Sequence, residues 1–117
     1  MIKNSQENSK KIKQFAINLR KNILDMALSA GANSSHFGGA LSIADVVATL
    51  FSTQIKFNKE PLWEDRDRFI LSKGHGCLAL YSILFDKGFL NKKQLMDIGS
   101  IKSILGGHPE HTIPGVE

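Results

Sequence analysis

Phe69-Ile70-Leu71-Ser72-Lys73-Gly74-His75-Gly76 joins a short apolar run to a loop in which glycines surround one histidine. The run is bounded by polar residues, which is typical of a buried strand. Apolar residues beyond the loop predict a helix that Gly88 closes: Leu78, Tyr81, Ile83, Leu84 and Phe85. Open α/β sheets use this order of strand, glycine loop and helix to hold phosphate groups. We therefore predict an α/β phosphate-binding unit at this point of the chain.

The combination of glycine and histidine occurs twice more. Ser35-His36-Phe37-Gly38-Gly39 precedes the first segment, and Gly106-Gly107-His108-Pro109-Glu110 follows it. Glycine lets backbone approach a ligand closely, and a histidine on such a loop offers a donor or acceptor that can change charge near neutral pH. We expect His36, His75 and His108 to converge on one polar site for a phosphorylated or polyhydroxylated ligand.

Helices dominate the rest of the pattern. Apolar residues recur at helical spacing over residues 12–30, and Gly31 supplies a stop. Ser42 with Asp45 resembles a capping box and predicts that a second helix begins there. A short helix is expected over residues 91–98, capped by its asparagine.

One predicted strand makes no sheet, because a sheet needs neighbouring strands. We therefore expect a helix-rich chain with at most a short sheet or an isolated strand near residues 69–71. The chain ends in a predicted loop at Pro114-Gly115-Val116-Glu117. We expect it to be the opening part of a larger α/β domain, with residues 1–9 as an N-terminal arm and residues 10–117 as the domain portion.

Composition limits the classes of protein to consider. With 117 residues, 42% hydrophobic and 22% charged, the chain is typical of one soluble globular domain. One cysteine, Cys77, excludes an internal disulfide and favours a reducing cytoplasm; we expect it to be buried and structural. No segment resembles a signal peptide or a membrane span.

Six of the fifteen basic side chains lie in residues 1–25, which we interpret as a solvated helix face and not a nucleic-acid site. The charged tetrad at residues 65–68 is interpreted as a surface pairing feature.

Three blocks of the sequence together resemble the N-terminal, cofactor-binding part of transketolase, and most closely the type in which that part is a separate subunit. The first block runs from Ser35 to Asp45, the second from Trp63 to Gly76, and the third from Gly107 to Glu117. They occur in the family's order, and the similarity extends over about residues 10–117. The resemblance implies the family's thiamine diphosphate-binding α/β fold, incomplete here.

The resemblance also implies a function. Transketolases transfer a two-carbon ketol unit from a ketose phosphate to an aldose with thiamine diphosphate and Mg²⁺ or Ca²⁺, in the cytoplasmic pentose phosphate pathway. It places His75, with Gly74 and Gly76, at the cofactor diphosphate. It places His36 and His108 near the thiazolium carbon, where they would bond substrate hydroxyls and developing alkoxide oxygens. His111 matches no family ligand and is expected to be a solvated loop residue.

The departures from the family pattern lead to further expectations. The family's Gly-Asp-Gly metal motif does not occur in this chain, so we expect it to supply one flank of the cofactor site, no metal ligands and no activity alone. The catalytic glutamate would come from a C-terminal transketolase subunit in a dimeric or heterotetrameric assembly. Two alternatives stay open: a deoxyxylulose-phosphate synthase relative, which the stretch Arg68–Gly76 disfavours, and a non-catalytic remnant or interaction module.

Overall fold

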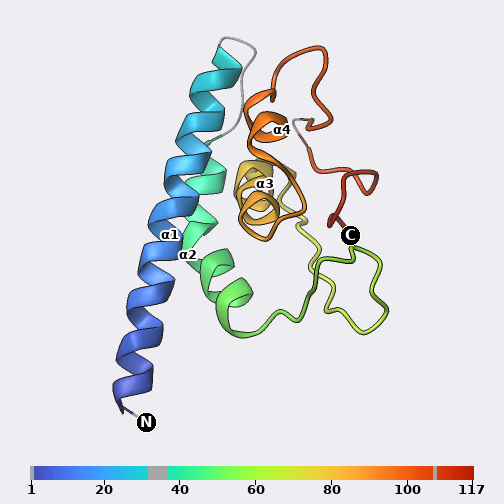
Figure 1. The fold of residues 1–117 in the computed structure, drawn as a ribbon. Helices are drawn as coiled ribbons and strands as arrows, with labels where there is room; N and C mark the ends of the chain where they lie inside the picture. Colours follow the sequence, from blue (N-terminus) through green and yellow to red (C-terminus); the bar gives the residue numbers. More distant parts are fainter. Residues whose placement is uncertain (1, 32–36, 107) are drawn as a thin grey trace.

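The computed structural model describes residues 2–31, 37–106 and 108–117, with side chains from residue 5 onward. Within these ranges the helices are α1 (Ile2–Ala30), α2 (Gly38–Thr53), the short 3₁₀-helix η2 (Gly74–Gly76), α3 (Cys77–Asp86) and α4 (Lys92–Met96). Helices α1 and α2 lie side by side, α3 packs against both, and α4 lies near the C-terminal end of α1 (Figure 1). The helix-rich character is confirmed, and none of the helices found there is long and apolar enough to cross a membrane.

The first helix buries the stripe that the periodicity predicted. Ala16, Leu19, Ile23, Met26 and Ala30 are all buried, and they follow one another at intervals of three and four residues. Gly31 ends the helix with φ +57°, a conformation that glycine adopts without strain. The N-terminal turns of α1 extend past the other helices (Figure 1) and are exposed over residues 5–11.

The second helix begins four residues earlier than the sequence predicted. Its N-cap is Phe37, whose side chain makes no capping hydrogen bond. The Ser42 hydroxyl donates to the Gly39 carbonyl oxygen at 2.8 Å, and the Asp45 carboxylate accepts two hydrogen bonds from Arg20, at 2.8 and 3.1 Å. The predicted capping box is therefore wrong, because both of its side chains are used for other contacts.

Helix α3 forms the centre of the core. Every residue from Cys77 to Leu84 is buried, including the large side chains of Leu78, Tyr81 and Ile83. A helix that is buried on all sides carries no polar stripe. This explains why the sequence in this region shows an almost continuous apolar run and not an amphipathic pattern.

The strand predicted at residues 69–71 is absent from the described structure. Ile70 is 73% exposed, and the residues from Phe69 to Lys73 have no regular secondary structure. Before them, Asp67 and Lys56 are joined by one backbone bond and one side-chain bond: the Asp67 N–H donates to the Lys56 carbonyl oxygen at 2.8 Å, while the Lys56 N–H donates to the Asp67 carboxylate at 2.7 Å. In a β-ladder the Lys56 N–H would donate to a backbone carbonyl oxygen. Here it donates to the Asp67 side chain instead, so no ladder forms at this pair of residues. The prediction of a buried strand was wrong.

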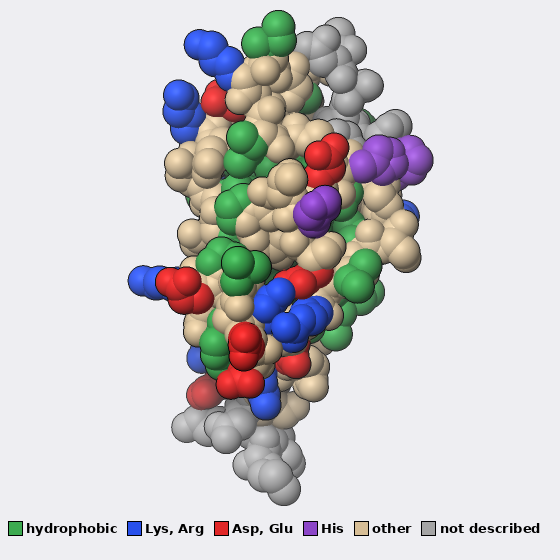
Figure 2. Space-filling model, turned by 90° about the vertical axis from the view of Figure 1, so that its right-hand side faces the viewer, with side chains coloured by type: hydrophobic (Ala, Val, Ile, Leu, Met, Phe, Trp, Pro, Cys, Tyr) green, Lys and Arg blue, Asp and Glu red, His purple; other side chains and the backbone are tan. Residues whose placement is uncertain are grey.

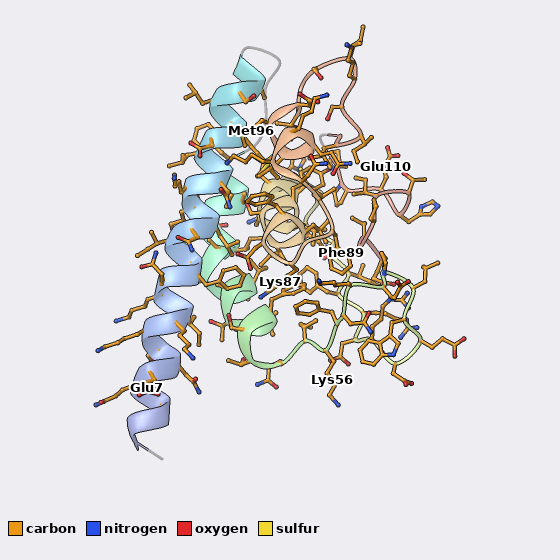
Figure 3. All side chains as sticks on the ribbon, viewed as in Figure 1. Glu7, Lys56, Lys87, Phe89, Met96 and Glu110 are labelled. Carbon is orange, nitrogen blue, oxygen red and sulfur yellow. The ribbon has the colours of Figure 1, made fainter. Side chains whose placement is uncertain are left out.

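Aromatic packing holds this segment in place of sheet bonding. The Phe51 ring at the end of α2 meets the Phe69 ring edge-on, with centroids 5.3 Å apart. Phe57 lies between Phe51 and Phe89, at 6.2 and 6.4 Å. The Lys87 ammonium group, which points into the space between the helices and this segment (Figure 3), lies 5.3 Å from the centroid of the Phe57 ring.

The short helix α4 confirms the predicted cap. The Asn91 side chain accepts from the Gln94 N–H at 2.8 Å, and the Gln94 side chain accepts from the Asn91 N–H at 2.9 Å. A hydrogen bond of 2.5 Å from the Ser29 hydroxyl to the Met96 carbonyl oxygen ties α4 to α1. The chain beyond α4 has no described helix and is anchored in the core by Leu105 and Ile113.

Candidate functional site

The structure brings two of the three predicted histidines into contact. The His75 ring, on η2, and the His108 ring, on the C-terminal segment, meet edge to face with centroids 5.0 Å apart and planes at 68°. Both side chains are exposed, and histidines gather on the face that carries the C-terminal segment (Figure 2). Two imidazoles from segments 33 residues apart thus form one polar surface feature.

Glycine at residue 74 makes this contact possible. A Cβ atom at Gly74 would overlap the His108 ring at Nδ1 and would lie 2.9 Å from its Cε1. The site therefore contains a point where an imidazole ring lies directly on peptide backbone, which no other residue type allows.

A second close approach joins η2 to the first turn of α2. A Cβ atom at Gly39 would lie 3.3 Å from the His75 carbonyl oxygen, and one at Gly76 would lie 2.9 Å from a terminal carbon of Ile43 and 3.7 Å from the Gly39 carbonyl oxygen. His36 itself lies outside the described residues. Gly39, which follows it in the first motif, does lie against the His75 loop, and the third motif contributes the His108 ring, so all three glycine–histidine motifs contribute to one region.

Lys73 connects the same two elements through its side chain. Its ammonium group donates to the Ser42 hydroxyl at 2.9 Å, and that hydroxyl donates to the Gly39 carbonyl oxygen. The sequence analysis assigned Ser42 only to a capping box and assigned no role to Lys73. The available signal was that Lys73 directly precedes the glycine loop and that Ser42 closely follows the first glycine–histidine motif.

Tyr81 contacts the backbone of the histidine pair, at His108, from the core. This tyrosine is fully buried, and its hydroxyl donates to the Gly106 carbonyl oxygen at 2.7 Å, with the His108 carbonyl oxygen as a second acceptor at 3.2 Å. Burial, with an additional contribution from Cys77, raises the pKa of the Tyr81 hydroxyl, which therefore stays protonated and donates. The sequence analysis used Tyr81 only as an apolar helix position and missed this role.

Cys77 has the buried position that we expected. Only 2% of it is exposed, and its Sγ lies 3.9 Å from the Gly106 carbonyl oxygen. Desolvation raises the pKa of the thiol, and a raised pKa disfavours the reactive thiolate. The start of α3 does not activate this cysteine.

The charged tetrad was predicted to be a surface pairing feature; one of its residues, Arg66, does form an ion pair, but with Glu117 and in a largely buried position. The Arg66 guanidinium makes two hydrogen bonds to the Glu117 carboxylate, at 2.6 and 3.1 Å, and both side chains are less than one-fifth exposed. This pairing raises the pKa of Arg66. Beside it lies an open cavity of about 550 Å³ that His111 helps to line; the His111 side chain is exposed, as expected.

The donors at the histidine pair suit an anionic group. Two exposed imidazoles stand beside glycine backbone, and the His108 ring covers the Gly74 backbone; we call this arrangement the cradle. Its exposed imidazole donors fit an anionic group such as a diphosphate. Across the part of the chain that the structure describes, no three His, Cys, Asp or Glu side chains gather in a way that could hold a metal ion.

Comparison with known proteins agrees with this description. Residues 12–117 match the family described as "Transketolase, thiamine diphosphate binding domain". Transketolase 1 of Aliivibrio fischeri is 42% identical over 89 residues, which are 74% of this chain and 13% of the relative. The transketolase of Buchnera aphidicola subsp. Baizongia pistaciae is 45% identical over the same shares. One subunit of the apulose-4-phosphate transketolase of Phocaeicola vulgatus is 38% identical over 104 residues, which are 84% of this chain and 34% of that relative.

The family match identifies this helical chain, with its glycine–histidine loops, as part of a cofactor-binding domain of a known type. The chain belongs to the transketolase family and matches its thiamine diphosphate-binding domain. It spans 13% of the length of the Aliivibrio fischeri relative and about one-third of the Phocaeicola vulgatus relative.

Proposed function

We propose that this chain forms one flank of the thiamine diphosphate site of a transketolase-type enzyme, which transfers a two-carbon ketol unit from a ketose phosphate to an aldose. The contact between His75 and His108 over Gly74 carries the proposal, because it places two motifs of the family in one exposed cradle. When bound, thiamine diphosphate supplies the carbanion chemistry of ketol transfer.

Each residue of the cradle has a separate task in this proposal. His75 donates to the diphosphate, and the glycines on either side let the His75 loop lie close to His108 and to the first turn of α2. His108 holds a proton at an imidazole nitrogen toward a substrate oxygen, where negative charge develops during the reaction. His36, which the family resemblance adds and which lies outside the described residues, has the same task in this proposal.

We propose the remaining parts of the enzyme from the family resemblance. The Phocaeicola vulgatus relative is itself one subunit of its enzyme, which supports a C-terminal partner chain that would bring the catalytic glutamate. A divalent cation, Mg²⁺ or Ca²⁺, would bridge diphosphate and protein with ligands from outside this chain. We place the enzyme in the cytoplasm and in the pentose phosphate pathway, with a dimeric or heterotetrameric assembly and sugar phosphate substrates.

A chimaera tests the proposal. Residues 12–117 of this chain would replace the corresponding segment of the Aliivibrio fischeri transketolase 1, and ketol transfer and cofactor affinity would be measured. His75→Ala should raise the dissociation constant for thiamine diphosphate between about fivefold and 150-fold, which corresponds to about 1–3 kcal/mol for a charge-assisted hydrogen bond. His108→Ala should instead lower kcat at saturating cofactor, since its bond strengthens in the transition state.

His111→Ala is the matched control, since this exposed histidine lines the cavity beside Arg66 and Glu117. It should change neither quantity. Equal and modest losses for all three variants would mean that the histidines are ordinary loop residues, and the proposed site would be wrong.

The chain by itself provides a second test. Without cation ligands it should bind thiamine diphosphate weakly, and added magnesium should not strengthen binding. Calorimetric titration with and without magnesium measures this. A strong signal that depends on magnesium would show that the chain holds a metal site of its own.

A further inference from the structure

Two core residues, Tyr81 and Cys77, direct a polar atom at the backbone that carries His108, and the Tyr81 contact is the shorter of the two. The Tyr81 side chain is completely buried within α3, yet its hydroxyl reaches the Gly106 carbonyl oxygen at 2.7 Å and the His108 carbonyl oxygen at 3.2 Å. A rigid core helix therefore makes direct contact with the exposed segment that presents a site histidine.

The His108 segment has little regular structure of its own to hold it. The residues described beyond α4 contain turns and bends but no helix. On its outer side, the His108 ring contacts His75 and lies over Gly74. On its inner side, Tyr81 supplies the hydrogen bonds that fix the main chain on both flanks of residue 107. The fixed backbone restricts the positions that the ring can reach.

We infer that Tyr81 is a positioning residue, which sets the direction of the His108 imidazole by holding the backbone of Gly106 and His108 from the core. This inference rests on the proposed function of His108, but the contact itself is testable without cofactor. A displacement of about 1 Å in a catalytic group can lower a rate about 100-fold. A buried hydroxyl with a raised pKa is suited to this task, because it stays protonated and donates near neutral pH.

Tyr81→Phe removes the hydroxyl and keeps the ring that fills the core. Ser82→Ala is the matched control: Ser82 is also fully buried in α3, but its hydroxyl reaches the Leu19 carbonyl oxygen of α1, at 3.4 Å. Both variants lose one buried hydroxyl, so a merely structural role predicts that they behave alike. A positioning role predicts that only Tyr81→Phe changes His108.

The test measures the imidazole proton signals of His75 and His108, and the cross-relaxation between them, by NMR on the 117-residue chain. Tyr81→Phe should shift the His108 signals and weaken the cross-relaxation at least twofold, while Ser82→Ala leaves both unchanged. Unchanged His108 signals in folded Tyr81→Phe would overturn the inference. If Tyr81→Phe does not fold, the unsubstituted chain decides: the Tyr81 hydroxyl proton should exchange slowly and show a cross-peak to His108, and its absence would also overturn the inference.

In the active chimaera, Tyr81→Phe should lower kcat about tenfold and leave the cofactor dissociation constant unchanged. A normal kcat despite shifted His108 signals would refute the positioning role. A chimaera that is inactive before any substitution would instead refute the proposed function, and the NMR result would still establish the contact.

Discussion

Gly74→Ala is the sharpest perturbation of the histidine pair, because it adds a single methyl group where the His108 ring already lies. The new Cβ would overlap Nδ1 and lie 2.9 and 3.3 Å from Cε1 and Cγ of that ring. Ordinary contacts of this kind begin near 3.4 Å. The ring therefore has to move by about 1 Å or more, which breaks its edge contact with His75.

Gly74→Ala should change the free energy of unfolding only slightly, but it should raise the activation free energy of the reaction at the site substantially. The His108 side chain is exposed, so it can move into solvent, and exposed changes usually alter the free energy of unfolding by about 0.5 kcal/mol or less. A site group displaced by about 1 Å can reduce a rate about 100-fold, which corresponds to about 2.7 kcal/mol in the activation free energy.

Two measurements separate these effects. Urea unfolding of the chain should show nearly unchanged stability for Gly74→Ala, and NMR should show the loss of cross-relaxation between the two imidazoles. Gly38→Ala is the matched control, because a Cβ at Gly38 meets nothing within 4 Å. An intact contact between the two rings in Gly74→Ala would refute this reasoning, and so would an equal loss of contact in Gly38→Ala.

Further predictions concern the scaffold. Leu19→Ala should lower the free energy of unfolding by about 2–5 kcal/mol, because Leu19 is fully buried, whereas Leu28→Ala, at an 82% exposed position, should change it by about 0.5 kcal/mol or less in the same urea titration. Cys77 should react with a colorimetric thiol reagent only after denaturant is added, since burial raises its pKa; fast reaction of the native chain would contradict the buried position. The Arg20 guanidinium holds the pKa of Asp45 below its ordinary value of 3.8, so this carboxylate stabilises the fold above that value and loses its effect as the pH falls through the lowered pKa. Asp45→Asn should therefore flatten the acid side of the stability profile, and an unchanged profile would show that the pair contributes nothing.

The helices could be predicted from the sequence because their signals are local. The stripe over residues 12–30 follows the helical period, and Asn91 with Gln94 makes a complete capping box. The start of α2 was mispredicted because Ser42 and Asp45 satisfy the same pattern as a cap while their partners, Gly39 and Arg20, lie elsewhere. A pattern of residue types does not specify whether a serine hydroxyl will accept from a backbone N–H or donate to a carbonyl oxygen.

The strand was mispredicted for a different reason. Phe69 and Leu71 are partly buried against the core, which is what an apolar run of three residues indicates, but burial alone does not supply a neighbouring strand. The candidate site, like the strand, was predicted only in part from local sequence signals. Glycines beside His75 and His108 indicated the site, whereas the contribution of Tyr81 depends on a contact between residues 25 and 27 positions apart, and no local pattern reveals such a contact.

Regular structure is concentrated in helices α1, α2 and α3, so we expect other parts of the chain to open before these helices do. Helices α1, α2 and α3 share one core, whereas the residues described after α4 contain no helix and are held by Leu105, Ile113, the Tyr81 hydroxyl and the Arg66–Glu117 pair. Segments with few hydrogen bonds open locally at a lower free energy than the global unfolding reaction. Amide hydrogen exchange should therefore be fast in this segment and slow in α3, so that His108 can leave the cradle while the helical core stays closed.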